Sequence, residues 1–353
     1  MEEIDFSAIK LKPADNFDPI YRLHIVMNET ITFLQEYEHL IYEEDFPRLF
    51  AHHVEKTHKE ILDRISVYYS DAAQKSKSLG IEHLLQQILI ENVSESARES
   101  WLKHQCFSLL RAFNILVSKI NDAIRDIPVA ELFRNDFIST NAMHLRKLII
   151  DAEEFLMGLE SYKGATPKRQ IGFNRGVKGF DSNWFAELLF NGIVDSSNFA
   201  FFVNLAFLLR DSIELRVRNG LGIREISMPD GKPAKIANDD FVDFLFSNEN
   251  IIIPKLNKAV IKKVFDWCNF HIHKGIVLYE WQLVLCYEYV RPLFARGVTD
   301  SQISLYGAVQ MNESYYRTKL ENDLEQFLIE KNPKNTGVQV TLLDSPEAML
   351  VNE

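Results

Sequence analysis

The side chains best suited to chemistry lie in two stretches of the chain that have helical spacing. In the first stretch, Arg210 and Glu214 are four residues apart, which places them on one face of a helix. In the second, Asp266, Asn269 and His273 fall at positions i, i+3 and i+7 and share one polar stripe. An asparagine and a histidine so close together can jointly hold a phosphodiester or a water, and histidine exchanges a proton near neutral pH. The two stretches therefore predict a polar site built from two helices.

Each half of this predicted site has a structural alternative. The helix that begins near residue 199 is almost wholly apolar on every side as far as Leu209, and an all-round apolar helix is normally central. A charge at the end of a buried run needs a partner or access to water. Arg210 and Glu214 therefore either form an ion pair that simply reaches the surface or line an internal polar site. His273 either belongs to the site or caps the C-terminus of its helix, where the helix dipole favours a cation.

Two segments resemble the two conserved helices of HEPN-type domains. They read LLRDSIELRVRNGLGI and VFDWCNFHIHKG. In part of that superfamily, one helix carries an Arg-x-x-x-Glu pattern followed by Leu-Gly, and the matching residues here are Arg210, Glu214, Leu221 and Gly222. A later helix carries Asn-x-x-x-His followed by a glycine or proline, and the matching residues are Asn269, His273 and Gly275. The resemblance covers roughly residues 190–297, under a third of the chain.

HEPN-type domains have four or five helices and occur in prokaryotic toxins, phage-defence proteins and eukaryotic RNA-processing proteins. The resemblance implies metal-independent cleavage of RNA, with no cofactor, in a homodimer whose two sites face each other. In that scheme His273 acts as general acid and base, and Asn269 positions the phosphate or orients the imidazole. Arg210 stabilises the developing charge, and Glu214 holds Arg210 in place.

One position departs from the family pattern. HEPN nucleases carry an arginine directly before the polar residue, whereas this chain has Cys268 before Asn269. A cysteine cannot supply the fixed cationic fork that stabilises charge on a phosphorane-like species. Either Arg210 substitutes from the facing helix, or the domain is non-catalytic. The alternative function is therefore a helical scaffold or protein-interaction module in which the four residues form a buried polar network and the acidic surface binds a partner protein.

A glycine-rich basic segment, Lys163 to Asp181, separates two helical regions and is the best candidate for a linker or loop. Its basic side chains are either solvated or contact phosphate or RNA, because glycine amides together with lysine and arginine suit anions. The residues that would make this contact are Lys168, Arg169, Arg175 and Lys178.

Apolar periodicity along the chain predicts an all-α protein of two domains, which agrees with its 353 residues. Residues 224–240 contain Pro229-Asp230-Gly231 and predict a small hairpin or loop. A last core helix near residues 279–296 should bend at Pro292. The predicted divisions are an N-terminal helical bundle at 1–162, the glycine-rich basic loop at 163–185, a HEPN-like helical domain at 186–300, and a C-terminal helix with a partly disordered polar tail at 301–353.

Composition narrows the class of function. The net charge of −11 argues against general coating of nucleic acid, which needs a basic surface. The three cysteines are far apart and form no CxxC pair, which argues against a thiolate zinc site and suits a reducing cytoplasm. The acidic N-terminus does not resemble a secretory signal, and the longest apolar stretch, Phe199 to Leu209, is too short to span a membrane. We therefore expect a cytoplasmic protein with no membrane partner.

A histidine-rich segment, HHVEKTH, contains a single Glu-x-x-His pattern, Glu55 to His58. Di-iron carboxylate bundles need two such motifs and two further glutamates. The sequence therefore predicts no metal site here.

Overall fold

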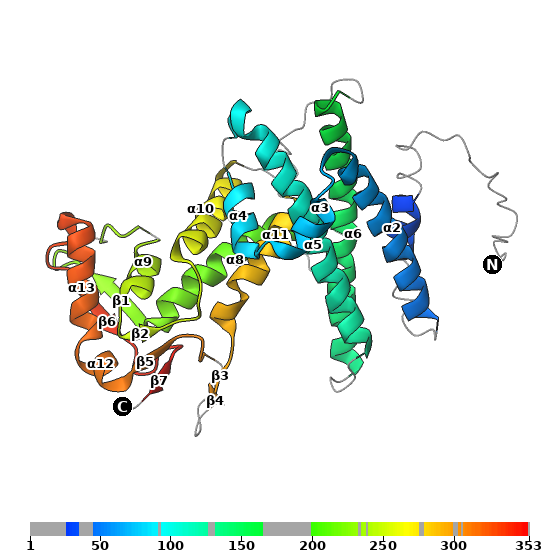
Figure 1. Cartoon of the computed structure of the whole chain (residues 1–353). Helices are drawn as coiled ribbons and strands as arrows, with labels where there is room; N and C mark the ends of the chain where they lie inside the picture. The colour runs from blue at the N-terminus through cyan, green and yellow to red at the C-terminus, as the bar shows by residue number, and fades with distance from the viewer. Residues whose placement is uncertain are drawn as a thin grey trace, which may run out of the picture. The chain divides into compact units, whose positions relative to one another are not determined.

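The computed structural model describes residues 26–34, 45–90, 93–125, 131–164, 199–231, 234–237, 239–274, 279–298, 303–304 and 306–351. These residues are predominantly α-helical with a few short strands, so the predicted all-α class is confirmed. Figure 1 shows the elements along the chain.

The chain divides into two compact units. Unit 1 comprises Met1–Ala73 and Phe113–Ile171, and unit 2 comprises Gln74–Ala112 and Gly172–Glu353. The predicted linker at 163–185 lies almost entirely outside the described residues, so that boundary stays a prediction. The structure differs from the predicted division in one respect, because residues 74–112 group with the C-terminal helices.

One indole hydrogen bond joins residues 74–112 to the C-terminal helices of unit 2, and a second lies within that segment. Trp281 Nε1 donates to Gln105 Oε1 over 2.7 Å, and both side chains are buried. Trp101 Nε1 donates to the carbonyl of Ile88 over 3.1 Å. Buried indole nitrogens need such acceptors, and these bonds lie inside a shared apolar core.

Unit 1 contains residues 26–34, which are helical, and helices with the following bounds: α2 Phe46–Tyr68, α6 Glu131–Tyr162, and the second half of α5 Glu95–Arg125. Pro47 lies in the first turn of α2, where its missing N–H is harmless, as the sequence predicted. Helix α2 packs against α6, and the pair Arg64 Nε and Glu160 Oε1 joins them at 2.6 Å with both side chains more than nine-tenths buried. Helix α3 spans Ala72–Ser78 at the division between the units.

Unit 2 is built around packed pairs among the four helices α4, α8, α10 and α11. Helix α8 packs against α10, and the shorter α4 packs against both α10 and α11 (Figure 1). The bounds are α4 Ile81–Ile88, α8 Phe199–Gly220, α9 Asp240–Ser247, α10 Lys258–Lys274, α11 Glu280–Val290, α12 Glu313–Thr318 and α13 Leu320–Lys331. After α11 the chain tightens into a 3₁₀ turn, Arg291–Phe294, which is the change predicted at Pro292.

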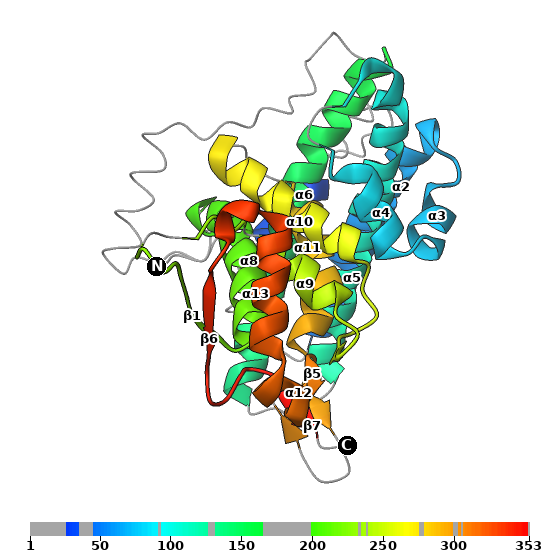
Figure 2. The ribbon, with the colours of Figure 1, turned by 90° about the vertical axis from the view of Figure 1, so that its left-hand side faces the viewer.

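The short strands of unit 2 join distant parts of its sequence. Strand β1, Ile223–Ser227, pairs antiparallel with β6, Gln339–Leu342 (Figure 2). Strand β5, Gln310–Asn312, lies between antiparallel β2, Ile251–Ile252, and parallel β7, Met349–Val351. Strands β3, Gly297–Val298, and β4, Ile303–Ser304, form a separate antiparallel pair.

These pairings correct two predictions. Residues 224–240 do not form a hairpin of their own, because β1 takes its partner from the C-terminal tail. The tail itself is regular, with two strands and the 3₁₀ turn Pro333–Asn335, and it is not disordered as far as residue 351. Strand character is visible locally in VQVTLL, residues 338–343, but local patterns do not pair β6 with β1, because the two strands are more than a hundred residues apart in the chain.

Candidate functional site

The predicted pair on α8 forms and faces α10. Arg210 Nη2 lies 3.2 Å from Glu214 Oε2, with 18% and 19% of the two side chains exposed. The guanidinium carbon of Arg210 is 5.2 Å from the centroid of the Phe265 ring on α10. Among the described residues, Arg210 Nε has no hydrogen-bond partner. The pair is therefore neither a simple surface pair nor a fully enclosed one, and it lies at the contact between the two helices.

Cys268 occupies the position where the HEPN pattern has an arginine, and its side chain is fully buried. Burial raises the pKa of Cys268 to about 12, although the positive charge of Arg210 opposes this shift. The thiol of Cys286 on α11 is buried as well, and burial raises its pKa well above the ordinary value. Both groups therefore stay neutral thiols at physiological pH, and position 268 belongs to the core of unit 2.

Asn269 follows on α10 and is half-buried. It is four residues after Phe265, so the two side chains start about 5–6 Å apart on the same side of the helix. The structure thus brings Arg210 and Glu214 to the turn of α10 that contains Phe265, one turn before Asn269. His273 lies in the last turn of α10, but its side chain is outside the described residues, so its distance from Arg210 stays a prediction.

The other predicted contact residues are not placed. Lys168, Arg169, Arg175 and Lys178 all lie outside the described residues, so their contact with RNA or another anion stays a prediction.

The Leu-Gly match after α8 has a structural explanation. Gly222 has φ +69°, and a Cβ there would lie 2.2 Å from the hydroxyl oxygen of Tyr316. That hydroxyl donates to the carbonyl of Leu343 over 2.7 Å, and Leu343 N donates to the carbonyl of Gly222 over 2.7 Å. Glycine is therefore needed to turn the chain from α8 into β1, whatever chemistry α8 performs.

Arg216 is a buried charge that the sequence analysis did not single out. Its guanidinium donates to three backbone carbonyls, those of Leu293 at 2.7 Å, Tyr306 at 2.8 Å and Glu347 at 2.5 Å. Burial lowers the pKa of Arg216 below its ordinary value. Arg216 therefore ties α8 to the C-terminal segments and is committed to structure.

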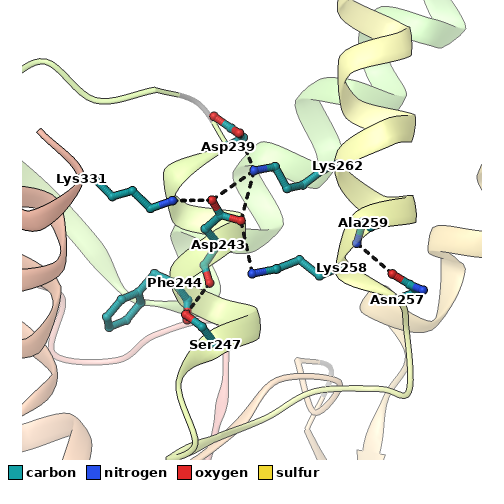
Figure 3. Close-up of polar contacts among 9 residues, drawn as sticks. All are labelled: Asp239, Asp243, Phe244, Ser247, Asn257, Lys258, Ala259, Lys262 and Lys331. Atoms are coloured by element: carbon teal, nitrogen blue, oxygen red, sulfur yellow. Dashed lines mark hydrogen bonds and ion pairs between the residues drawn. The ribbon is translucent and has the colours of Figure 1, made fainter.

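Asp243 is the second charged centre that sequence reasoning missed (Figure 3). Its carboxylate accepts hydrogen bonds from Lys262 at 3.1 Å and from Lys331 at 2.7 Å, and Lys258 Nζ lies 3.6 Å away. Lys262 also pairs with Asp239 at 2.7 Å. Burial alone would raise the pKa of Asp243, but the bonds from Lys331 and Lys262 lower it. The cluster joins α9, α10 and α13. The sequence shows only that Asp239 and Asp243 are four residues apart and that Lys258 and Lys262 are four residues apart.

The histidine-rich segment of α2 packs against aromatic rings. His53 stacks on Phe33 with 4.7 Å between ring centroids, and burial lowers the pKa of His53. His58 lies 5.3 Å from the ring of Phe113. Within the described ranges, no group of three His, Cys, Asp or Glu side chains is arranged to hold a metal ion. None of the described helices is both long and apolar enough to cross a membrane.

No family model, curated protein or solved structure matches the chain. The case for a function therefore rests on the contacts in unit 2 themselves.

Proposed function

We propose that unit 2 is a non-catalytic interaction module with a degenerate HEPN-like site. The observation that carries this proposal is the state of Cys268. The residue is buried, and burial raises the pKa of its thiol to about 12, so it supplies no positive charge. An arginine at that position would have to leave the core before it could reach a phosphate.

The contacts of Arg210 support the same conclusion. Its charge is already balanced by Glu214 at 3.2 Å, and its guanidinium lies over the ring of Phe265. A partly buried ion pair of this kind holds its two side chains in one geometry, and removal of one partner leaves an uncompensated charge. In this proposal Arg210, Glu214 and Asn269 fix how α8 packs on α10, and the acidic surface of the chain, which carries a net charge of −11, receives a partner protein.

The experiment is an RNA-cleavage assay with the purified chain. Single-stranded RNA is incubated with the protein in the presence of a chelator, and the fragments are resolved on a denaturing gel. We expect no cleavage by the wild type or by His273→Ala. Cleavage that needs no metal and disappears in a folded His273→Ala variant would overturn the proposal.

A second function, a metal-independent ribonuclease of a defence or toxin system, is favoured by the position of Arg210. Its guanidinium reaches α10 at Phe265, one turn before Asn269, and so it could supply from α8 the charge that position 268 lacks. In this scheme His273 takes the proton of the ribose 2′-hydroxyl as that oxygen attacks phosphorus. The bond from phosphorus to the 5′-oxygen breaks as a 2′,3′-cyclic phosphate forms, and protonated His273 returns the proton to the leaving 5′-oxygen.

The ribonuclease scheme carries two further expectations. The HEPN resemblance implies a homodimer, which analytical ultracentrifugation would detect as a sedimenting species of twice the chain mass. In this scheme the glycine-rich basic segment contacts the RNA, so replacing Lys168, Arg169, Arg175 and Lys178 together by glutamine should weaken RNA binding and reduce its dependence on salt. A monomer whose weak RNA binding is unchanged by these substitutions contradicts the scheme.

A further inference from the structure

A pocket of about 360 Å³ opens beside α10 in unit 2, at the lower end of the size range of small-molecule sites. One stripe of α10 lines it, because its residues recur at i, i+4, i+7 and i+11: Ala259, Lys263, Asp266 and Phe270. This stripe lies on a different side of the helix from Phe265, which faces α8. The pocket is therefore separate from the HEPN-like region described above.

Lys263 brings to this pocket an ammonium group whose charge no described carboxylate balances. Its Nζ donates to the carbonyl of Gln86 on α4 over 2.6 Å, and among the described residues it forms no ion pair. An ammonium group has three donors, so this contact leaves two of them for another acceptor. Burial also lowers the pKa of Lys263, because the ammonium is partly removed from water. An anion in the pocket would restore the interactions that the ammonium loses on burial.

Asp266 brings the opposite charge to the rim of the pocket, and within the described ranges it forms no ion pair either. Partial desolvation and the negative charge of Asp239 raise the pKa of its carboxyl. Lys262 does not fully balance Asp266, because it pairs with Asp239 at 2.7 Å and with Asp243 at 3.1 Å (Figure 3). A cation beside Asp266 would offset both effects on its pKa, whereas an anion would be repelled.

Lys263 and Asp266 lie about one turn apart on α10, and the hydrogen bond to Gln86 draws the ammonium of Lys263 toward α4 and not toward Asp266. Side chains three residues apart on a helix begin about 5–6 Å from each other. A ligand that satisfies both residues must therefore present an anion and a cation close together. An α-amino acid does so, because its carboxylate and its ammonium are attached to the same carbon.

The wall of the pocket beyond these charges is apolar and partly aromatic. Leu89, Trp267 and Phe270 line it, and Phe270 is half-buried. The ring of Trp267 packs edge to face against His271 with 4.3 Å between ring centroids, which holds the indole in one orientation. Aromatic rings gain from offset or edge-to-face contact with one another beyond the area that they bury. The wall therefore suits a ligand side chain that carries an aromatic ring.

We propose that this pocket binds a free α-amino acid with an aromatic side chain, such as phenylalanine. The carboxylate of the ligand accepts from Lys263, its ammonium donates to Asp266, and its ring lies against Phe270 and Trp267. The C-terminus of a peptide offers the same carboxylate and side chain, but a neutral amide replaces the ammonium, and the charge of Asp266 favours the ammonium. The proposal requires neither RNA nor a protein partner, so it stands or falls independently of the function proposed above.

Isothermal titration calorimetry on the full chain tests the ligand chemistry. We expect L-phenylalanine to bind, and we expect phenethylamine, which lacks the carboxylate, and 3-phenylpropanoate, which lacks the ammonium, to bind roughly tenfold more weakly. L-Alanine keeps both charges but has no ring, and it should also bind more weakly. Absence of phenylalanine binding refutes the proposal. Equal binding of N-acetylphenylalanine would show that the pocket takes a peptide C-terminus and would overturn the proposal as well.

Substitution of Lys263 separates a binding role from a structural one. Lys263→Gln removes the charge but keeps an N–H donor for the Gln86 carbonyl. It should weaken phenylalanine binding roughly tenfold and leave phenethylamine binding unchanged, because phenethylamine has no carboxylate to lose a partner. Lys255→Gln, a substitution of an exposed lysine outside the pocket, is the matched control and should bind phenylalanine like the wild type. A Lys263→Gln variant with a lowered unfolding temperature and unchanged phenylalanine affinity would show that Lys263 only clamps α4 to α10.

Substitution of Asp266 tests the other half of the ligand without disturbing packing. Asp266 is exposed, so Asp266→Asn should fold normally. We expect this variant to bind phenylalanine roughly tenfold more weakly and 3-phenylpropanoate as the wild type does, because only phenylalanine has an ammonium for Asp266. Glu249→Gln neutralises an exposed carboxylate outside the pocket and should change neither affinity. Equal loss of affinity for both ligands in Asp266→Asn would overturn the assigned position of the ammonium.

Discussion

Arg210 on α8 lies over the ring of Phe265 on α10, with 5.2 Å between the guanidinium carbon and the ring centroid. This contact places a charged side chain at the interface of α8 and α10. The charge of Arg210 also opposes the rise in the pKa of the Cys268 thiol that burial causes. Glu214 completes the arrangement from the same side of α8. Substitutions of Arg210, Glu214 and Cys268 can therefore test whether this arrangement serves catalysis or the packing of α8 on α10.

A double-mutant cycle measures the packing role of the Arg210–Glu214 pair. Glu214→Gln should destabilise the protein by about 1–2 kcal/mol, because it leaves a largely buried guanidinium without its counter-charge. Arg210→Met should have a similar effect through loss of the pair and of the contact with Phe265. The double variant should be less destabilised than the sum, with a coupling free energy of about 0.5–1.5 kcal/mol. Urea unfolding monitored by circular dichroism gives the values, and simple additivity would show that the two charges act independently.

Introducing an arginine at position 268, as in the HEPN pattern, tests directly whether this position is confined to the core. Cys268→Arg should destabilise unit 2 by roughly 3 kcal/mol or more, since it forces a second cation into the core beside Arg210. The control Cys268→Ala removes only a sulfur atom and should lower the free energy of unfolding by about 1 kcal/mol. Thermal unfolding and the RNA-cleavage assay are measured together. A Cys268→Arg variant that folds normally and gains cleavage would show that position 268 can open to solvent.

Sequence reasoning succeeded where partners are close in the chain. The helices and the Arg210–Glu214 pair follow from spacings of three and four residues, and the structure confirms them. Asp266 and Asn269 lie on the more exposed side of α10, as the predicted polar stripe requires.

Sequence reasoning failed where a residue has its partner in a segment that is distant along the chain. The carbonyls that accept from Arg216 are 77, 90 and 131 residues away, and no local pattern marks that arginine among its neighbours. Lys331 is 88 residues from Asp243 for the same reason. The pocket of α10 depends on Leu89, which a single sequence does not connect with that helix. These partners are set by tertiary contacts between distant segments, which helical spacing does not predict.

The clamp formed by Arg216 predicts that lysine cannot replace it. Arg216→Lys keeps the charge but loses the planar fork that reaches three carbonyls at once. We expect a loss of about 2–4 kcal/mol in the free energy of unfolding, with buried carbonyls left without donors. Arg218→Lys on the same helix is the control, because the guanidinium carbon of Arg218 lies 5.6 Å from the centroid of the Phe241 ring and, among the described residues, Arg218 has no side-chain hydrogen bond or ion pair. This substitution should change stability by less than about 1 kcal/mol. Equal effects of the two substitutions would contradict the clamp.

The Asp243 cluster predicts a specific dependence of stability on pH. The pKa of Asp243 in the folded protein lies below its ordinary value of 3.8. Its charged form therefore stabilises the fold fully above that ordinary value, and this stabilisation is lost as the pH falls through the lowered value. Asp243→Asn should destabilise the protein by about 2–3 kcal/mol at neutral pH, because Lys258 and Lys331 lose their buried counter-charge.

The difference in unfolding free energy between wild type and Asp243→Asn should remain constant from neutral pH down to about pH 5 and shrink below about pH 4. Urea unfolding across this range measures it. Glu330→Gln, a neutralisation of an exposed carboxylate on α13 next to Lys331, is the control and should show neither effect. If the variant differs from the wild type by the same amount at every pH, the lysines do not hold Asp243 ionised, and the joint between α9, α10 and α13 depends on packing alone.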